Sequence, residues 1–229
     1  QNATSFKANQ CVFQNTQEAA IVCRANELDE FIMTDCEFTN TSKPGGNGAG
    51  IYVMSNTADS AGDYVDIHRF ELNNCKFTNS VGGGYGGAVA LFGYVHSGLI
   101  SGCTFTNCKS TEQGGGALEL AGSMGAFTIQ NSKFSGCTSK YRGGAIEIRS
   151  TNIKNSSDQE RWTRSNAISI SGCTFENCSS ADSHGGAIAV KAQLHTFSVS
   201  GSSFTNCVAG INGGAISIDG QDLPDTFAN

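Results

Sequence analysis

The stretch CTFTNCKSTEQGGGAL, residues 103–118, contains the two short motifs that decide the fold. The first is Cys-x-Phe-x-Asn, and the second is Gly-Gly-Ala followed by an aliphatic residue. Related copies of this pair recur seven times along the 229-residue chain, and successive phenylalanines lie 28 or 29 residues apart in the regular units. A repeat with a period of this size indicates a stack of similar supersecondary units. The seven phenylalanines are Phe13, Phe38, Phe77, Phe105, Phe134, Phe175 and Phe204.

Each repeat reads as three short strands, because apolar and other residues alternate with a period of two. The clearest copy runs through 187–190, 197–199 and 201–204, with Gly, Ser and Asn at the turns. One unit has too few apolar residues for a core of its own, whereas stacked units bury a continuous one. The handedness of parallel crossovers favours a right-handed coil. The sequence therefore predicts an all-β fold, a single right-handed parallel β-helix of about seven coils over residues 1–229, with polar insertions near 55–64 and 150–166.

Stacking turns each repeat position into a column that runs along the molecule. The seven phenylalanines are expected to form an internal aromatic stack. The Gly-Gly steps are expected to allow a tight corner with positive φ. The residue two positions after each phenylalanine has the same strand parity, so its amide is expected to face inward and to bond to the coils above and below. These residues are Asn15, Asn40, Asn79, Asn107, Asn177 and Asn206, with Gly136 in one copy.

Ten cysteines suggest an oxidising compartment. Nine of them fall into two columns, two residues before and three residues after the phenylalanine, where Ser or Thr fills the remaining places. Bridges between neighbouring coils would pair Cys11–Cys36, Cys75–Cys103, Cys108–Cys137 and Cys178–Cys207. Bridges within a coil, Cys103–Cys108 and Cys173–Cys178, are the competing scheme, and Cys23 has no evident partner. A zinc site is not expected, because no histidine pattern accompanies these cysteines.

The net charge of the chain and the length of its apolar runs exclude several classes of partner. The net charge of −6 and the pI near 5.1 disfavour nucleic acids and anionic membranes. Apolar runs are too short to span a bilayer. Glycosylation sequons point weakly to a secretory route and an extracellular or cell-surface location. Asn2 and Asn155 are the expected acceptors, while Asn40 and Asn177 are expected to be blocked inside the coil.

The Phe-x-Asn and Gly-Gly-Ala-aliphatic motifs resemble the repeats of chlamydial polymorphic outer membrane proteins and of related β-helix surface proteins. The resemblance extends from about Phe6 to Ile218. It implies a secreted β-helix that is displayed on a surface and used in adhesion, in some cases after self-assembly.

The sequence shows no convincing catalytic cluster, and we expect no catalytic residue, cofactor or metal. Glu119 and Glu147 occupy the same outward position in adjacent units and could form a carboxylate pair with raised pKa values. Because Arg149 follows at once, a solvated surface face is the preferred interpretation. The four histidines share no spacing typical of a metal site or a triad, and His184 is interpreted as a turn residue.

Three functions remain open. The stretches 5–9 and 226–229 resemble the same strand of the repeat, and neither end of the sequence contains a capping helix. The first hypothesis is therefore a secreted structural protein that stacks end to end into a filament or coat, although a piece of a longer solenoid would look the same. The second is an adhesin segment whose insertions contact a receptor or glycan. The third is a polysaccharide lyase or hydrolase.

Overall fold

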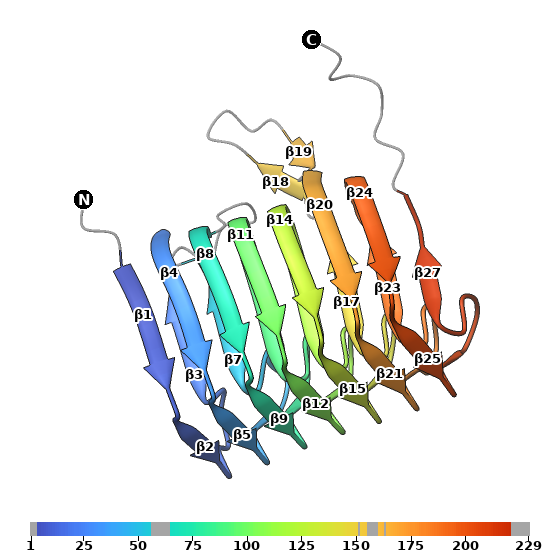
Figure 1. The fold of residues 1–229 in the computed structure, drawn as a ribbon, viewed down its shortest axis with the longest axis horizontal. Coiled ribbons are helices and arrows are strands. Elements are labelled where there is room, and N and C mark those ends of the chain that lie inside the picture. The colour runs from blue at the N-terminus through green and yellow to red at the C-terminus, as the bar shows by residue number, and fades with distance from the viewer. Residues whose placement is uncertain (1–3, 56–64, 151, 155–159, 163, 221–229) are drawn as a thin grey trace.

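The computed structural model describes residues 4–55, 65–150, 152–154, 160–162 and 164–220, and in these ranges the ordered elements are all strands. The chain winds through successive coils whose strands stack in parallel along one axis (Figure 1). The predicted insertions near 55–64 and 150–166 lie mostly outside the described residues, as do Asn2, Asn155 and the stretch 226–229.

The largest sheet has twelve strands and forms two sides of each coil. Strands β11 and β14 run through both sides, whereas other coils divide the same path between two strands, such as β7 and β8. Its strands are β1 (Thr4–Asn9), β3 (Ile21–Arg24), β4 (Glu27–Thr34), β7 (Ile51–Met54), β8 (Val65–Asn73), β11 (Val89–Ser101), β14 (Leu118–Gln130), β17 (Ile146–Arg149), β20 (Arg164–Ser171), β23 (Ile188–Lys191), β24 (Gln193–Ser200) and β27 (Ile216–Ile218).

Two smaller parallel sheets close the coil. The seven-stranded sheet carries the phenylalanines of the repeat and consists of β2 (Val12–Gln14), β5 (Glu37–Thr39), β9 (Lys76–Thr78), β12 (Thr104–Thr106), β15 (Lys133–Ser135), β21 (Thr174–Glu176) and β25 (Ser203–Thr205). The six-stranded sheet consists of β6 (Ser42–Lys43), β10 (Val81–Gly82), β13 (Lys109–Ser110), β16 (Thr138–Ser139), β22 (Ser179–Ser180) and β26 (Val208–Ala209). An antiparallel hairpin, β18 (Asn152–Lys154) and β19 (Glu160–Trp162), projects from one side of the stack (Figure 1).

The three strands predicted for each coil correspond to the two sides of the twelve-stranded sheet and to the seven-stranded sheet. The two-residue strands of the third sheet have no counterpart in the prediction. They are too short to show an alternation, and they begin four residues after each repeat phenylalanine from Phe38 onward, at positions such as Lys109 and Thr138. All-β architecture and parallel pairing are as predicted.

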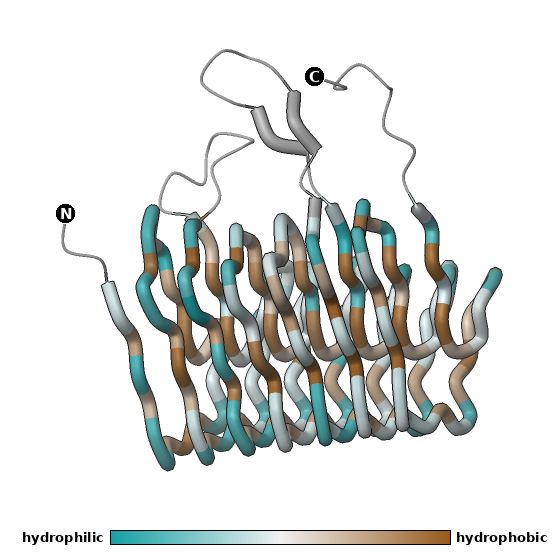
Figure 2. Tube along the Cα trace, turned by 45° about the horizontal axis from the view of Figure 1, so that its top comes forward, coloured by the Kyte–Doolittle hydropathy of each residue, from teal (hydrophilic) through white to brown (hydrophobic). Residues whose placement is uncertain are grey.

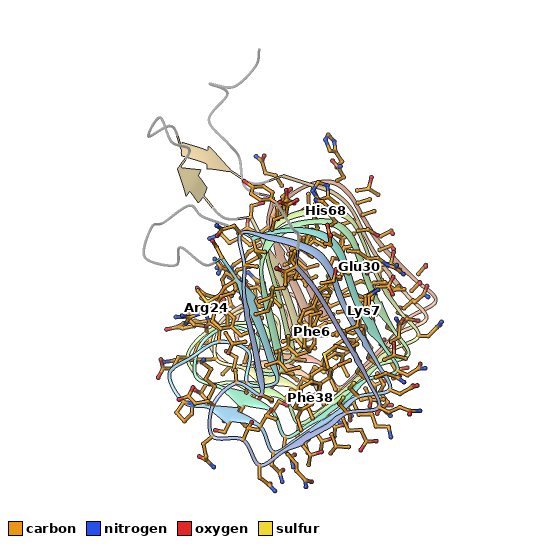
Figure 3. All side chains as sticks on the ribbon, turned by 90° about the vertical axis from the view of Figure 1, so that its left-hand side faces the viewer. Phe6, Lys7, Arg24, Glu30, Phe38 and His68 are labelled. Atoms are coloured by element: carbon orange, nitrogen blue, oxygen red, sulfur yellow. The ribbon has the colours of Figure 1, made fainter. Side chains whose placement is uncertain are left out.

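The core is a continuous set of apolar columns along the axis of the stack (Figure 2). The seven phenylalanine rings lie in register, and neighbouring ring centroids are 4.6–4.9 Å apart. Seen from the N-terminal end, Phe6 and Phe38 point inward, whereas Lys7, Arg24 and Glu30 point outward (Figure 3). Offset parallel rings favour this spacing, so the aromatic stack stabilises the alignment of the coils.

Among the described residues, no helix is long and apolar enough to cross a membrane.

Candidate functional site

The asparagine column faces solvent, so its predicted inward orientation is wrong. Asn40 and Asn177 are exposed, and both have φ near +54°. A left-handed residue at the corner interrupts the alternation of the strand, so the next position, three residues after the phenylalanine, turns inward instead. Thr41 and Ser80 are fully buried there. The expected amide ladder is present on the outside, for example from Asn79 Nδ2 to Asn40 Oδ1 at 3.0 Å.

Nine cysteines line the interior of two corners and Cys23 lies on β3, and the structure holds all ten as free thiols. None of the four predicted bridges is formed, although each pair consists of neighbours in one column. The Cys11 amide lies 3.5 Å from Cys36 Sγ, and thiols also bond to carbonyls of the preceding coil, as Cys103 Sγ does to Leu72 O at 3.4 Å. Burial raises the pKa of Cys137 well above its ordinary value. These thiols are packing groups of the corner, and intercoil disulfides stay a prediction.

Glu119 and Glu147 are buried, contrary to the solvated face expected for them. They pair in register on β14 and β17 and point away from the core. The exposed fraction is 0% for Glu119 and 4% for Glu147, because segments of neighbouring coils cover this face. A side chain at Gly114 would collide with Glu147 Oε2 and the Arg142 carbonyl, so a glycine is needed for the covering loop to lie this close.

Arg149 provides the positive charge for the buried pair. Its Nε donates to Glu119 Oε1, while Glu119 Oε2 lacks a hydrogen-bond partner among the described residues. Burial raises the pKa of both carboxyl groups, and the charge of Glu147 raises that of Glu119 further. Burial works to lower the pKa of Arg149, but the charges of Glu119, Tyr85 and Glu147 and the hydrogen bond to Glu119 together outweigh it and hold that pKa above its usual value. One guanidinium against two buried carboxyls favours a single negative charge on the pair.

Aromatic rings lie next to this pair on the same face. The Arg149 guanidinium sits 4.2 Å from the centroid of the Tyr85 ring and 5.4 Å from that of Phe92. Phe92 in turn meets Tyr52 edge to face, with centroids 5.9 Å apart. The small residue Ala90 separates Tyr52 from Glu119 in their column, which leaves room for the rings above the sheet. All three rings and Arg149 are partly exposed.

A hollow continues this surface towards the C-terminal coils. Its walls include Arg142, His184, Asn212 and Asp219. Arg142 connects the hollow to the rings, because it lines the hollow and stands in the repeat position of Tyr85, two coils further along the stack. We call the surface formed by Tyr52, Tyr85, Phe92, Arg149, Arg142 and His184 the lateral strip.

The lateral strip combines flat apolar rings with cations, and the carboxyl groups of Glu119 and Glu147 lie beneath its surface. Such a surface can bind a ligand that has apolar faces and negative charge. General acid catalysis needs a carboxyl group within hydrogen-bond reach of the reacting atom, and Glu119 and Glu147 do not reach the surface.

The lateral strip was not predicted from the sequence, for an identifiable reason. Tyr52 stands in the repeat position of Glu119 and Glu147, so the column could have been found by alignment alone. Tyr85 and Arg142 precede the first glycine of their Gly-Gly steps, as His184 does. Phe92 and Arg149 share a third position, because both pair with Ala121. The strip therefore draws on three columns, and only the folded loop brings them together.

The architecture and the closed parallel stack define a β-solenoid. The family described as right handed beta helix region matches residues 62–223, and the chain belongs to that family. No curated protein and no solved structure matches the chain, so these comparisons give no support to the resemblance to chlamydial polymorphic outer membrane proteins.

Proposed function

We propose that this protein is a secreted, non-catalytic binding module whose lateral strip holds an extended anionic glycan. One observation carries the proposal: the carboxyl groups of Glu119 and Glu147 are buried on this face, while the rings and arginines of the strip are partly exposed. A solenoid can extend such a surface along its axis, because successive coils repeat the same three columns.

The chemistry of the strip fits a sugar polymer. The apolar face of a pyranose ring can pack on Tyr52, Tyr85 or Phe92, and Arg142 and Arg149 can pair with carboxylate or sulfate groups. The protein has a net charge of −6, so these cations form a local positive surface on an acidic molecule. Bidentate pairing favours arginine for planar carboxylates and for other oxyanions.

Burial of Glu119 and Glu147 argues against a lyase or hydrolase that uses this pair. A glycosidase places two carboxyl groups on either side of the scissile bond. Here the two groups stack in adjacent coils, and Glu119 is engaged by Arg149. The strip is therefore better suited to holding a chain than to cleaving it.

Binding to a glycan panel tests the proposal. We expect acidic polysaccharides to bind and neutral ones to bind weakly or not at all, with affinity that falls as salt rises. Arg142→Ala should weaken binding at least about tenfold, the effect of losing roughly 1.4 kcal/mol of charge-assisted contact. Lys133→Ala removes an exposed cation on the seven-stranded sheet and should leave binding unchanged. Equal binding by the Arg142 variant, or turnover of any bound polysaccharide, contradicts the proposal.

End-to-end association is a second candidate, favoured by the uncovered ends of the core columns. Phe38 through Phe175 are fully buried in the stack, whereas Phe13 and Phe204 are only partly buried. Ile218 belongs to an inward column, yet 64% of it is exposed. Another coil placed on either edge would cover these side chains and pair the open strands. Sedimentation at increasing protein concentration tests whether copies of the chain supply that coil.

A further inference from the structure

A cluster of imidazole and carboxylate groups lies on the outer face of the twelve-stranded sheet, away from the lateral strip. It contains Glu27 and Asp29 on β4, Asp66 and His68 on β8, and His96 on β11. Figure 3 shows His68 on the outside of the coil. From the residues and contacts of this cluster, we propose that it is a binding site for a divalent transition metal, with Zn²⁺ as the best fit, and that His68, His96 and Asp66 are its principal ligands.

The repeat explains why these groups meet. Ile67 pairs with both Leu28 and Val95, so the residues one position later, Asp29, His68 and His96, fall side by side in one column. Each stands nine residues before the phenylalanine of its repeat. Glu27 and Asp66 are paired two positions earlier on the same face. Three of the four histidines therefore have this offset, since His195 has it as well, although they were not expected to share a spacing typical of a metal site.

The distances place ligand atoms around a common point. His96 Nε2 lies 2.7 Å from Asp66 Oδ1, and His68 Nδ1 lies 3.3 Å from Asp29 Oδ1. One ligand atom each from Asp66, His68 and His96 lies within 4.8 Å of the others, and the same holds for Glu27, Asp29 and His68. Ligand atoms around a tetrahedral zinc ion are about 3.3 Å apart. Small side-chain rotations would therefore bring the first three groups to that spacing.

Exposure makes those rotations possible and keeps the site open to a metal ion. About half of each side chain is accessible, with 48% of His68 and 62% of His96 exposed. The two rings meet edge to face with centroids 5.2 Å apart, so both can turn a nitrogen to the same side. A site of this kind would tie β4, β8 and β11 together and leave a coordination position open.

The local charge is not balanced by a lysine or arginine. Among the described residues, the ion pairs of Glu27, Asp29 and Asp66 are with histidine alone. The nearby cations are engaged elsewhere: Lys7 pairs with Glu30, and Arg69 pairs with Glu30 and Glu71. Three carboxylates beside two imidazoles favour a cation, and imidazole nitrogen favours Zn²⁺ over Ca²⁺ or Mg²⁺.

Titration calorimetry of the intact chain with Zn²⁺ tests the site. We expect one zinc ion per chain, no comparable binding of Ca²⁺, and weaker binding at acidic pH because imidazole binds metal only when it is neutral. His68→Ala and His96→Ala each remove a direct ligand. Each should lower affinity by more than the roughly 10–100-fold lost when a partner outside the ligand set is removed. His195→Ala changes the same column position on another coil and should have no effect.

The cysteines provide the main alternative source of zinc binding, and the substitution of Co²⁺ separates the two. Nitrogen and oxygen ligands give a cobalt spectrum without the thiolate-to-metal charge-transfer band that cysteine ligation produces. Wild-type affinity in the His68→Ala/His96→Ala variant, a thiolate band, or no binding by the wild type would overturn the proposal. The variants change exposed side chains, so circular dichroism should show the same fold in each.

Discussion

Glu119 occupies a repeat position that also holds Tyr52, Ala90 and Glu147, and its neighbours decide its chemistry. A carboxylate at an outward position of a strand is ordinarily solvated, and Glu119 is fully buried because loop residues of other coils cover it. Arg149 then changes from a surface cation into the counter-charge of a buried pair.

The raised pKa values of Glu119 and Glu147 predict how stability depends on pH. An unfolded glutamate has a pKa of about 4.3, so between that pH and the folded-state pKa the folded chain holds more protons than the unfolded one. The contribution of the pair is fully present below about pH 4.3 and is lost as pH rises through the folded-state pKa values. The expected slope is up to about 1.4 kcal/mol per pH unit for one proton. Urea denaturation midpoints from pH 4.5 to 8 measure it.

Glu119→Gln should flatten this pH dependence, because the amide keeps the shape of the side chain and leaves Glu147 to balance Arg149. Glu112→Gln removes an exposed carboxylate and serves as the matched control, with a profile parallel to that of the wild type. A Glu119→Gln profile as steep as the wild-type profile would show that the pair does not hold the extra proton.

At the scale of the element, the corners determine what can be predicted from the sequence. Strand positions were predictable, because an alternation with a period of two residues puts the phenylalanine of each repeat, such as Phe105 or Phe134, on the inward side of its coil. The orientation of the asparagine at the corner was not predictable in this way. Its left-handed conformation reverses the inward and outward alternation of the residues after it, and the prediction assumed that all residues are extended. The tolerance of Gly136 in this column, with φ +64°, was the available sign that the position favours positive φ.

The candidate sites were harder to predict than the fold for a related reason. The buried state of Glu119 depends on covering loops, and the meeting of His68 with Asp66 and His96 depends on the register between coils. Aligning the repeat by its phenylalanines supplies that register, which would have placed Asp29, His68 and His96 in one column. The side-chain rotamers of the cluster and the loops that cover Glu119 are visible only in the folded structure.

The second glycine of the Gly-Gly step is predicted to be essential inside the stack. A Cβ on Gly116 would lie 2.0 Å from the carbonyl oxygen of Gly144 in the next coil, and backbone cannot move aside cheaply. Gly116→Ala should therefore destabilise the fold by about 3 kcal/mol or more, at or above the usual range for overpacking. Urea denaturation of the dilute protein measures the loss.

Gly214 occupies the same repeat position in the last described coil and gives a matched control. A Cβ there would meet only the Cys207 carbonyl oxygen, at 3.4 Å. Gly214→Ala should change stability by no more than about 0.5 kcal/mol in dilute solution. Equal losses in the two variants would mean that the close approach of the coils does not explain the glycine.

At the scale of the whole molecule, the stack is quasi-one-dimensional, so each coil depends on its neighbours for cover. The inner coils bury their phenylalanines completely, whereas the outermost described coils leave Phe13 and Phe204 partly exposed. If one molecule covers the open edge of another, the contact should repeat the geometry between internal coils, which is a heterologous and open-ended arrangement.

That arrangement predicts a second effect of Gly214→Ala. In the internal coils the Cβ of this position would collide with the next coil, so the added methyl at Gly214 projects into the space that a stacked neighbour would fill. Wild-type protein should form elongated assemblies as its concentration rises, and Gly214→Ala should shift this association to at least about tenfold higher concentration, the equivalent of roughly 1.4 kcal/mol. Sedimentation velocity measures both, and Lys133→Ala, on a lateral face, should associate like the wild type. A wild type that stays monomeric at high concentration would exclude end-to-end assembly of this chain, and unchanged association of the Gly214 variant would exclude contact through this edge.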